Sequence, residues 1–206
     1  MKGTELEKRM NSKIAPQFTF PSHVYGETFL GYNSDNLKNI ETSIELIRRG
    51  DVNGSSYSNT EFGWQSRCIP QGGVFENITQ RICAEAYNFI KQLESFNFSK
   101  ITMSNLWANI NYKGDINWPH NHGGDLSGAY YIKVPENSGN LEFVRYSDRL
   151  TKLGSFFNKN YCKVLKPQKD KLILFDSACL HLVTKNNNVE PRISLSFNLD
   201  IDEGSQ

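Results

Sequence analysis

The segment PRISLSFNLD, residues 191–200, decides the fold class because its apolar and polar side chains alternate without a break. The apolar residues that share one face of such an extended chain are Ile193, Leu195, Phe197 and Leu199. The polar residues on the opposite face are Arg192, Ser194, Ser196 and Asn198. The apolar row must pack against helices or a second sheet, while the polar row faces either water or a polar cavity inside a barrel.

Other segments after residue 100 have the same period of two. They are short, rich in β-formers and separated by turn signals such as PENSGN (135–140) and KNNN (185–188). The predicted strands are TMSNLWANINY (102–112), LSGAYYIKV (126–134), NLEFVRY (140–146), KLILFDS (171–177) and CLHLV (179–183). With no helix expected between them, the pattern favours an antiparallel sandwich or barrel.

Two amphipathic helices are expected before this region. In the first, residues 34–50, Ser34 or Asp35 could cap the start and Gly50 could supply a left-handed end. Its predicted apolar face is Leu37, Ile40, Ile44 and Ile47. The second helix spans about residues 76–96, with an apolar stripe of Ile78, Ile82, Ala86, Phe89, Ile90 and Leu93. The fold class is therefore mainly β with N-terminal helices packed on one outer face.

Composition bounds the class of protein. The 206 residues carry a formal net charge of +1, which argues against a surface built for nucleic acid or an anionic membrane. An aromatic content of 12% can fill a core, so disorder is excluded; only the first thirteen residues and the final DEGSQ read as frayed ends. No apolar run reaches membrane-spanning length and no signal peptide is evident. The scattered Cys68, Cys83, Cys162 and Cys179 predict buried, reduced thiols in a cytoplasmic protein.

Three of the four histidines are candidates for a metal site. His120 and His122 stand two residues apart and would project to the same side of an extended strand. His181 follows 59 residues later in CLHLV, which could lie across a barrel from them. Three imidazoles that converge in this way suit divalent iron, zinc, copper or nickel. The alternative is that the pair lies in a loop and His181 is a core histidine; His23 reads as a surface residue.

Arg192 and Ser194 lie on the polar row, eleven and thirteen residues after His181. A guanidinium deep in a barrel needs an anion, and its fork matches a carboxylate through two parallel hydrogen bonds. Ser194 points to the same side and could donate to the same carboxylate. A pairing of Arg192 with an internal Asp or Glu is the alternative.

These blocks together resemble a family of 2-oxoglutarate/Fe(II)-dependent oxygenases. The matching blocks are W-x-N (107–109), H-x-H (120–122), S-G-x-x-Y (127–131), L-F-x-S-x-x-x-H (174–181) and R-I-S-x-x-x-N (192–198). The resemblance implies a double-stranded β-helix, or jelly roll, and a single oxygenase domain over residues 1–206. Its helical part would span about residues 1–98 and its β-helix core about residues 99–201.

The resemblance also implies the cofactors and the roles of the site residues. Fe(II) would be the metal, 2-oxoglutarate the cosubstrate and O₂ the oxidant, with hydroxylation of an unidentified substrate and release of succinate and CO₂. The distal carboxylate of 2-oxoglutarate would meet Arg192 and Ser194. Asn109 and Tyr131 would lie on the pocket wall, although Tyr131 could equally be a core aromatic residue.

One position departs from the wider superfamily, which holds iron with a His-x-Asp/Glu…His triad. Residue 122 is a histidine. Either His120, His122 and His181 all bind the metal, which the spacing of the pair favours, or Asp125 is a ligand and one of the paired histidines is not. Gly123 and Gly124 leave the direction of Asp125 open.

The leading hypothesis is a 2-oxoglutarate-dependent non-haem iron dioxygenase that acts on a small molecule or a protein side chain. One rival is a cofactor-independent, cupin-type dioxygenase with three histidine ligands, which would not need Arg192. The other is a β-sandwich module that binds a metal without catalysis.

Overall fold

The larger of two β-sheets is built around its two longest strands, β4 (Phe98–Asn111) and β11 (Arg192–Glu203). In this computed structural model, which describes residues 14–19, 23–93, 97–144 and 163–203, these strands pair antiparallel from Asn111 opposite Arg192 to Phe98 opposite Glu203. The sheet has the strand order β1-β2-β9-β6-β11-β4-β3. Its other strands are β1 (Gln17–Thr19), β2 (His23–Phe29), β3 (Trp64–Gln65), β6 (Leu126–Lys133) and β9 (Lys171–Asp176).

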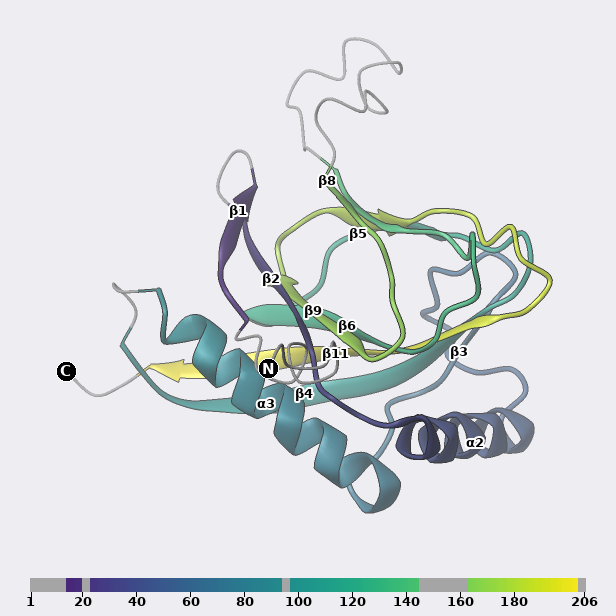
Figure 1. Cartoon of the computed structure of the whole chain (residues 1–206), viewed down its shortest axis with the longest axis horizontal. Helices are drawn as coiled ribbons and strands as arrows, with labels where there is room; N and C mark the ends of the chain where they lie inside the picture. The colour runs from purple at the N-terminus through teal and green to yellow at the C-terminus, as the bar shows by residue number, and fades with distance from the viewer. Residues whose placement is uncertain (1–13, 20–22, 94–96, 145–162, 204–206) are drawn as a thin grey trace, which may run out of the picture.

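A smaller sheet of four strands lies over one face of the larger sheet (Figure 1). Its order is β5-β10-β7-β8, formed by β5 (Asn117–His120), β10 (His181–Val183), β7 (Leu141–Phe143) and β8 (Lys163–Leu165). Every pair of neighbouring strands in both sheets is antiparallel. The two facing sheets make the double-stranded β-helix, or jelly roll, that the sequence predicts.

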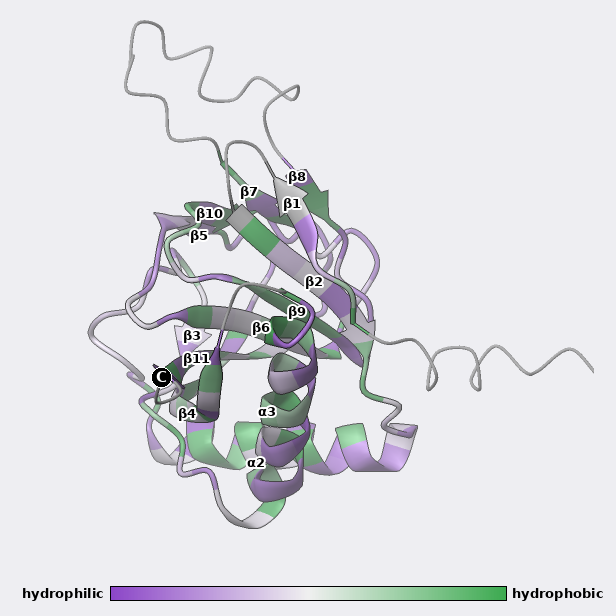
Figure 2. Ribbon diagram, turned by 90° about the vertical axis from the view of Figure 1, so that its left-hand side faces the viewer, coloured by the Kyte–Doolittle hydropathy of each residue, from purple (hydrophilic) through white to green (hydrophobic). Residues whose placement is uncertain are grey.

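Two helices cover the other face of the larger sheet, α2 (Ser34–Gly50) and α3 (Glu76–Ile90), the latter preceded by the short 3₁₀ helix η1 (Gly73–Phe75). Figure 2, turned from the view of Figure 1, shows both helices on the side away from β5, β7, β8 and β10. Helix α2 contacts β6, and α3 contacts β4. The molecule therefore has three layers, with the larger sheet in the middle.

Strand β11 has the two faces that its sequence predicts. Its apolar residues Ile193, Leu195, Phe197 and Leu199 are buried in the core shared with both helices. Arg192, Ser194 and Ser196 face the opposite way and line a cavity between the sheets. Of the two surroundings considered for the polar row, the structure shows the polar cavity.

Helix α2 has the predicted range, but its ends differ from the expectation. Asn33, not Ser34 or Asp35, is the N-cap, and its side-chain oxygen accepts a hydrogen bond from the backbone N–H of Asn36 at 2.9 Å. Asparagine is among the best N-caps, so a free N–H group at the start of the helix is satisfied by a residue that precedes both expected caps. Gly50 is the last helical residue rather than a left-handed cap, and the N–H of Asp51 closes the final turn on the carbonyl of Ile47.

Other boundaries also differ from the expected ones. Helix α3 ends at Ile90, and Leu93, expected on its apolar stripe, packs against the core just beyond the helix. The part of the chain before residue 98 contributes β1, β2 and β3 to the larger sheet as well as the helices. Asp202 and Glu203, expected in a frayed end, pair within β11 because β4 continues opposite them. The first thirteen residues lie outside the described part of the chain.

Cys68, Cys83 and Cys179 are free thiols, as expected, but only Cys179 is buried; Cys83 is partly exposed and Cys68 is exposed, so the expected burial is wrong for these two. Cys162 lies outside the described residues. Among the helices that the structure describes, none has the length and apolar character needed to span a membrane.

Gly128 of β6 marks the tightest packing between β6, β9 and β11. A Cβ atom at this position would overlap the Phe197 ring and the backbone carbonyl oxygen of Ile173. We expect Gly128→Ala to lower the free energy of unfolding by about 3 kcal/mol, at the upper end for an overpacked core. Gly72→Ala is the control, because nothing lies within 4 Å of its Cβ position, and it should change stability by less than about 0.5 kcal/mol. Urea unfolding of both variants measures the difference, and equal stabilities would contradict the packing described here.

Candidate metal centre

The space between the two sheets is a polar cavity of about 390 Å³. Side chains from both sheets line it, together with those of the loop between α2 and β3, which contributes Ser55, Tyr57 and Asn59. All seven candidate site residues predicted from the sequence line this one cavity, namely Asn109, His120, His122, Tyr131, His181, Arg192 and Ser194. The fold therefore brings together residues that the chain separates by more than eighty positions.

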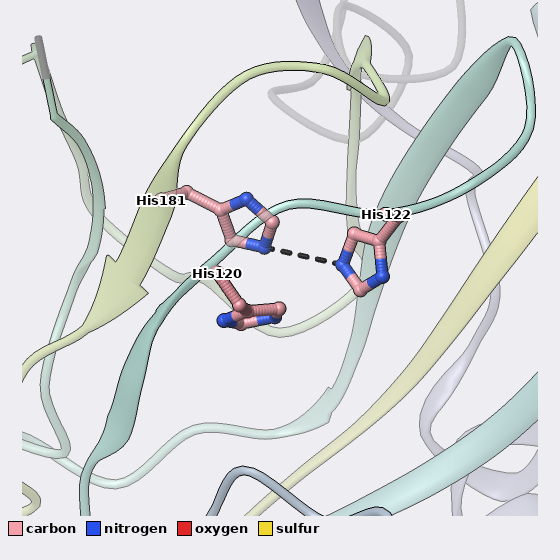
Figure 3. A group of neighbouring side chains, drawn as sticks. All are labelled: His120, His122 and His181. Carbon is pink, nitrogen blue, oxygen red and sulfur yellow. Dashed lines mark hydrogen bonds between the residues drawn. The ribbon is translucent and has the colours of Figure 1, made fainter. Parts of the chain in front are cut away.

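The three histidines, which line this cavity, lie close to one another (Figure 3). His120 is the last residue of β5 and His181 is the first residue of β10, and the two are directly paired across these strands. One ring nitrogen from each of the three imidazoles lies within 4.8 Å of the others, and the Nε2 atoms of His122 and His181 are 3.3 Å apart. Metal–nitrogen bonds of about 2.1 Å bring ligand nitrogens to within about 4.2 Å of one another, so the three imidazoles would close slightly around a transition metal.

His122 reaches this cluster from a position outside the strand. Strand β5 ends at His120, so the alternation of an extended strand does not by itself direct the second histidine. The backbone N–H of His122 donates to the carbonyl of Ser177 at 3.0 Å, which ties the segment after β5 to the end of β9. His120 and His122 therefore do converge, but the hydrogen bond to Ser177 helps to direct the His122 side chain.

Backbone carbonyls orient two of the imidazoles. The Nδ1 atom of His120 lies 2.7 Å from the carbonyl of Trp118, and that of His181 lies 2.9 Å from the carbonyl of Cys179. A carbonyl can only accept, so Nδ1 carries the proton in both rings and the lone pair is left on Nε2. Such contacts fix the ring orientation and the tautomer that a metal ligand needs.

Burial keeps the three imidazoles neutral. It lowers the pKa of His120, and it lowers the pKa of His122 to about 4, with help from the positive charge that His120 would carry. The pKa of His181 falls to about 3, mainly through burial, and repulsion by His120 adds to it. A neutral imidazole can donate its lone pair, whereas an imidazolium cannot. The donor set thus fits a divalent transition metal at neutral pH.

Asp125, the alternative ligand, is not part of the cluster. Its Oδ2 accepts a hydrogen bond from the backbone N–H of Ile201 at 2.8 Å, and its own N–H donates to the carbonyl of Leu199. The carboxylate is therefore held against β11. This arrangement supports the hypothesis of three histidine ligands over the hypothesis that includes Asp125.

Arg192 is buried in the cavity wall, with 2% of its surface exposed. Its Nη1 donates to the carbonyl of Ser138 at 3.0 Å and its Nη2 donates to Oδ1 of Asn111 at 2.7 Å. Its Nε is buried and has no hydrogen-bond partner in the described part of the chain. Burial lowers the pKa of Arg192, although Tyr131 and Asp115 oppose that shift. An anion in the cavity would satisfy both the charge and the unpaired N–H.

Ser194 lies between two other predicted residues on neighbouring strands. It pairs with Asn109 of β4 on one side and with Tyr131 of β6 on the other. Asn109 donates through Nδ2 to Ser196 Oγ at 3.0 Å, while its buried Oδ1 has no partner among the described residues. Burial raises the pKa of Tyr131, so its phenol stays protonated and can donate. The three side chains form a polar line across the sheet.

Several residues of the same cavity were not predicted from the sequence. Trp107 lies beside the metal-site candidates, with its ring centroid 5.5 Å from that of His122. Asn105 and Asn111 also line the cavity, as does Asn117 of β5. The alternation of β4 could have found three of them, because residues 105, 107, 109 and 111 share one face of the strand.

Comparison with known proteins gives the family. A family model described as "Putative 2OG-Fe(II) oxygenase" matches residues 105–198, which include all seven predicted site residues. Over these residues the match indicates a 2-oxoglutarate/Fe(II) oxygenase. No curated protein matches this oxygenase in sequence.

Solved structures share the fold of this oxygenase at low sequence identity. A prolyl-4-hydroxylase of Pseudomonas putida is 12% identical, with 87% of this chain and 92% of that chain covered and a TM-score of 0.61. The epimerase SnoN from nogalamycin biosynthesis is 14% identical over 86% of this chain and 76% of its own, with a TM-score of 0.63. HygX of Streptomyces hygroscopicus, solved with nickel and 2-oxoglutarate, is 9% identical over 85% and 82%, with a TM-score of 0.60. At these identities the likeness shows the jelly-roll fold.

Substitution distinguishes the two ligand sets. We expect His122→Ala to weaken Mn(II) binding by more than about 100-fold, because losing even a hydrogen-bond partner of a ligand costs about 10–100-fold. Asp125→Ala removes only the hydrogen bond to Ile201 and should keep the Mn(II) affinity. Anaerobic calorimetry with Mn(II) measures both. Loss of binding in Asp125→Ala with retention in His122→Ala would establish the carboxylate as the ligand instead.

Burial of the histidines predicts how stability depends on pH. Their folded pKa values lie below the ordinary value of 6.5, so the metal-free protein should lose stability as pH falls below about 6.5 and the unfolded chain binds protons first. The loss should continue until His122 and His181 titrate in the folded state, at about pH 4 and pH 3. Urea unfolding over this range checks it. In His122→Gln, whose side chain is neutral at every pH, the free energy of unfolding should fall less steeply with decreasing pH. An unchanged slope would contradict the lowered pKa of His122.

Proposed function

We propose that this oxygenase is a 2-oxoglutarate- and Fe(II)-dependent dioxygenase that hydroxylates a small molecule or a protein side chain. The observation that carries the proposal is the presence, in one cavity, of three neutral imidazoles and a buried arginine with an unpaired N–H. Fe(II) is the metal that His120, His122 and His181 would hold. We also propose that the whole chain forms one oxygenase domain, because α2 and α3 pack on the sheet that bears the site.

Two groups of side chains in the cavity would bind different parts of the cosubstrate complex. The imidazoles would bind the metal through ring nitrogens, and the guanidinium with Ser194 would receive the distal carboxylate of 2-oxoglutarate. Bound together, iron and cosubstrate supply the oxidising chemistry that uses O₂ to hydroxylate a C–H bond, with succinate and CO₂ as coproducts. The two sheets would hold the metal and 2-oxoglutarate in fixed positions relative to each other and limit the access of water.

Tyr131 and Asn109 would complete the cosubstrate subsite. Tyr131 stays protonated and lies beside Ser194, so its hydroxyl can donate to a carboxylate oxygen. Asn109 keeps an unpaired Oδ1 in the cavity wall, which can accept from a bound water or from a substrate donor. Both would act by orienting the bound molecule.

The two rival functions fit the cavity less well. A cofactor-independent, cupin-type dioxygenase or a non-catalytic metal-binding module needs the histidines but gives Arg192 no anion. Asp115 offsets part of the cost of burying the Arg192 guanidinium, but its unpaired Nε–H still costs free energy that an anionic ligand would recover. The position of Arg192 therefore favours the 2-oxoglutarate-dependent reaction.

The substrate belongs to one of two classes. The similar structures include a prolyl-4-hydroxylase and HygX with hygromycin B bound, so both a protein residue and a small molecule are represented. A screen of succinate release over peptides, amino acids and small molecules would identify it. We also propose a cytoplasmic location, since Cys68, Cys83 and Cys179 are free thiols.

Replacing Arg192 tests the cosubstrate subsite. We expect Arg192→Ala to weaken 2-oxoglutarate binding by about thirtyfold to several thousandfold, because truncating one partner of a buried pair costs about 2–5 kcal/mol. Arg192→Lys should recover only part of the loss, since an ammonium keeps the charge but not the fork. Calorimetry with Mn(II) under anaerobic conditions measures the binding without turnover.

Arg81→Ala serves as the control for the Arg192 experiment. Arg81 also donates to a backbone carbonyl, that of Leu30, but it lies on α3, outside the cavity, so 2-oxoglutarate affinity should be unchanged. Mn(II) affinity should hold in every variant because no arginine is a metal ligand. Equal 2-oxoglutarate affinity in wild type and Arg192→Ala would remove Arg192 from the subsite and leave the rival functions.

A further inference from the structure

Behind Arg192 lies a chain of buried polar contacts that the proposed reaction does not use. Nη2 of Arg192 donates to Oδ1 of Asn111, and Nδ2 of Asn111 donates to Oδ2 of Asp115 at 2.6 Å. Asn111 and Asp115 are each only 1% exposed. Asp115 is thus a buried carboxylate linked to the cavity arginine through one amide.

The amide of Asn111 can adopt only one orientation in this network. Its oxygen accepts from Arg192, while its nitrogen donates both to Asp115 and to Oδ1 of Asn117, the latter at 2.9 Å. A carboxylate cannot donate at neutral pH, so Asp115 requires the nitrogen of Asn111 to face it. Asp115 therefore determines that the oxygen of Asn111 faces Arg192.

The other oxygen of Asp115 holds the loop that leads to the cavity mouth. Oδ1 accepts from the backbone N–H groups of Glu61 at 2.9 Å and Phe62 at 2.8 Å. The next residue is Gly63, where a Cβ atom would overlap the carboxylate. Asn59 of the same loop accepts from Nδ2 of Asn117 and lines the cavity. One carboxylate thus contacts both the arginine relay and the loop.

Charge also connects Asp115 with Arg192. The negative charge of Asp115 raises the pKa of Arg192 against the effect of burial. At the same time a fixed negative charge near the guanidinium disfavours a second anion in the cavity. Orientation and charge therefore predict opposite effects on cosubstrate affinity when the carboxylate is replaced by an amide.

We propose that Asp115 is a positioning residue for the cosubstrate: through Asn111 it fixes the Arg192 guanidinium so that its unpaired edge is presented to the distal carboxylate of 2-oxoglutarate. This inference rests on the proposed function, because it takes Arg192 to be the carboxylate-binding group. It adds that the arginine needs the Asn111–Asp115 relay to bind well, although neither relay residue belongs to the histidine cluster proposed to hold the metal.

Asp115→Asn reverses the relay while keeping its shape. If the new amide keeps its oxygen on the N–H groups of Glu61 and Phe62, its NH₂ group faces Nδ2 of Asn111. The amide of Asn111 must then turn over, which directs its own NH₂ group at Arg192. We expect 2-oxoglutarate to bind the Mn(II) form at least about tenfold more weakly, a coupling typical of residues in one hydrogen-bond network. Mn(II) affinity should stay at the wild-type value. Unchanged or tighter 2-oxoglutarate binding would overturn the proposal, because removal of the charge alone favours the anion.

Asp170→Asn is a matched control for general destabilisation. Asp170 also accepts two backbone N–H groups, from Gly31 and Tyr32, and one side-chain donor, the Tyr130 hydroxyl at 2.6 Å. It lies outside the cavity, so its variant should lose stability to urea without losing 2-oxoglutarate affinity. If Asp170→Asn weakens 2-oxoglutarate as much as Asp115→Asn does, the effect of Asp115 is merely structural and the proposal is wrong.

Asn111→Ala provides a second, independent variant should Asp115→Asn not fold. It removes the link but leaves Asp115 bonded to the 61–62 amides, and we expect a similar loss of 2-oxoglutarate affinity. In the Asn111→Ala background, Asp115→Asn should add less than about twofold, because the relay is already broken. Full additivity, or unchanged 2-oxoglutarate affinity in Asn111→Ala, would contradict the relay.

The outcomes also separate this inference from the proposed function. If wild type binds no 2-oxoglutarate, or Arg192→Ala binds it as well as wild type, the proposed function itself fails. If Arg192→Ala weakens binding while Asp115→Asn and Asn111→Ala do not, the function stands and the positioning role of Asp115 is wrong.

Discussion

One strand, β11, separates the apolar core from the polar cavity, and the rest of the structure depends on how it is paired. Hydrogen bonds to β4 on one side and β6 on the other fix its register, so its alternate side chains cannot exchange faces without exposing the core. Ile193, Leu195 and Phe197 are thereby packed toward the helices. The same register places Arg192 and Ser194 in the cavity. Core packing and the proposed cosubstrate subsite therefore share a single geometric constraint.

Desolvation then governs the chemistry of the cavity. Burial lowers the pKa of each of the three histidines, which leaves their lone pairs available to a cation. The guanidinium of Arg192, which is buried in the wall of the same cavity, stays charged and needs an anion. Withdrawal from water thus creates both a site for a metal and a site for a carboxylate. A keto acid that chelates the metal and carries a second carboxylate satisfies both requirements at once.

Much of the fold could be predicted from periodicity. The change from a period of 3.6 to a period of 2 near residue 100 separates the helices from the strands, and the range of α2 matches the predicted one. Strands β1, β2 and β3 were not predicted. β1 and β3 have three and two residues, too few side chains to show alternation. β2 has seven residues, but Gly26, Glu27 and Thr28 in its middle interrupt any apolar alternation. The cap at Asn33 and the end of α3 at Ile90 differ because helix ends respond to local hydrogen bonds and neighbouring segments.

The sequence by itself determined the antiparallel sandwich or barrel class, the histidine and arginine motif and the two faces of β11, because these follow from residue type and local spacing; the jelly roll was implied by the family resemblance. Only the tertiary structure decided how His122 reaches the metal cluster from beyond β5, where the Asp125 carboxylate lies, and that Asp115 stands behind Arg192. Each of these depends on contacts between segments far apart in the chain, such as His122 with Ser177 and Asp115 with the 61–62 amides. Spacing along one strand contains no information about such contacts, since sheet pairing and loop closure create them.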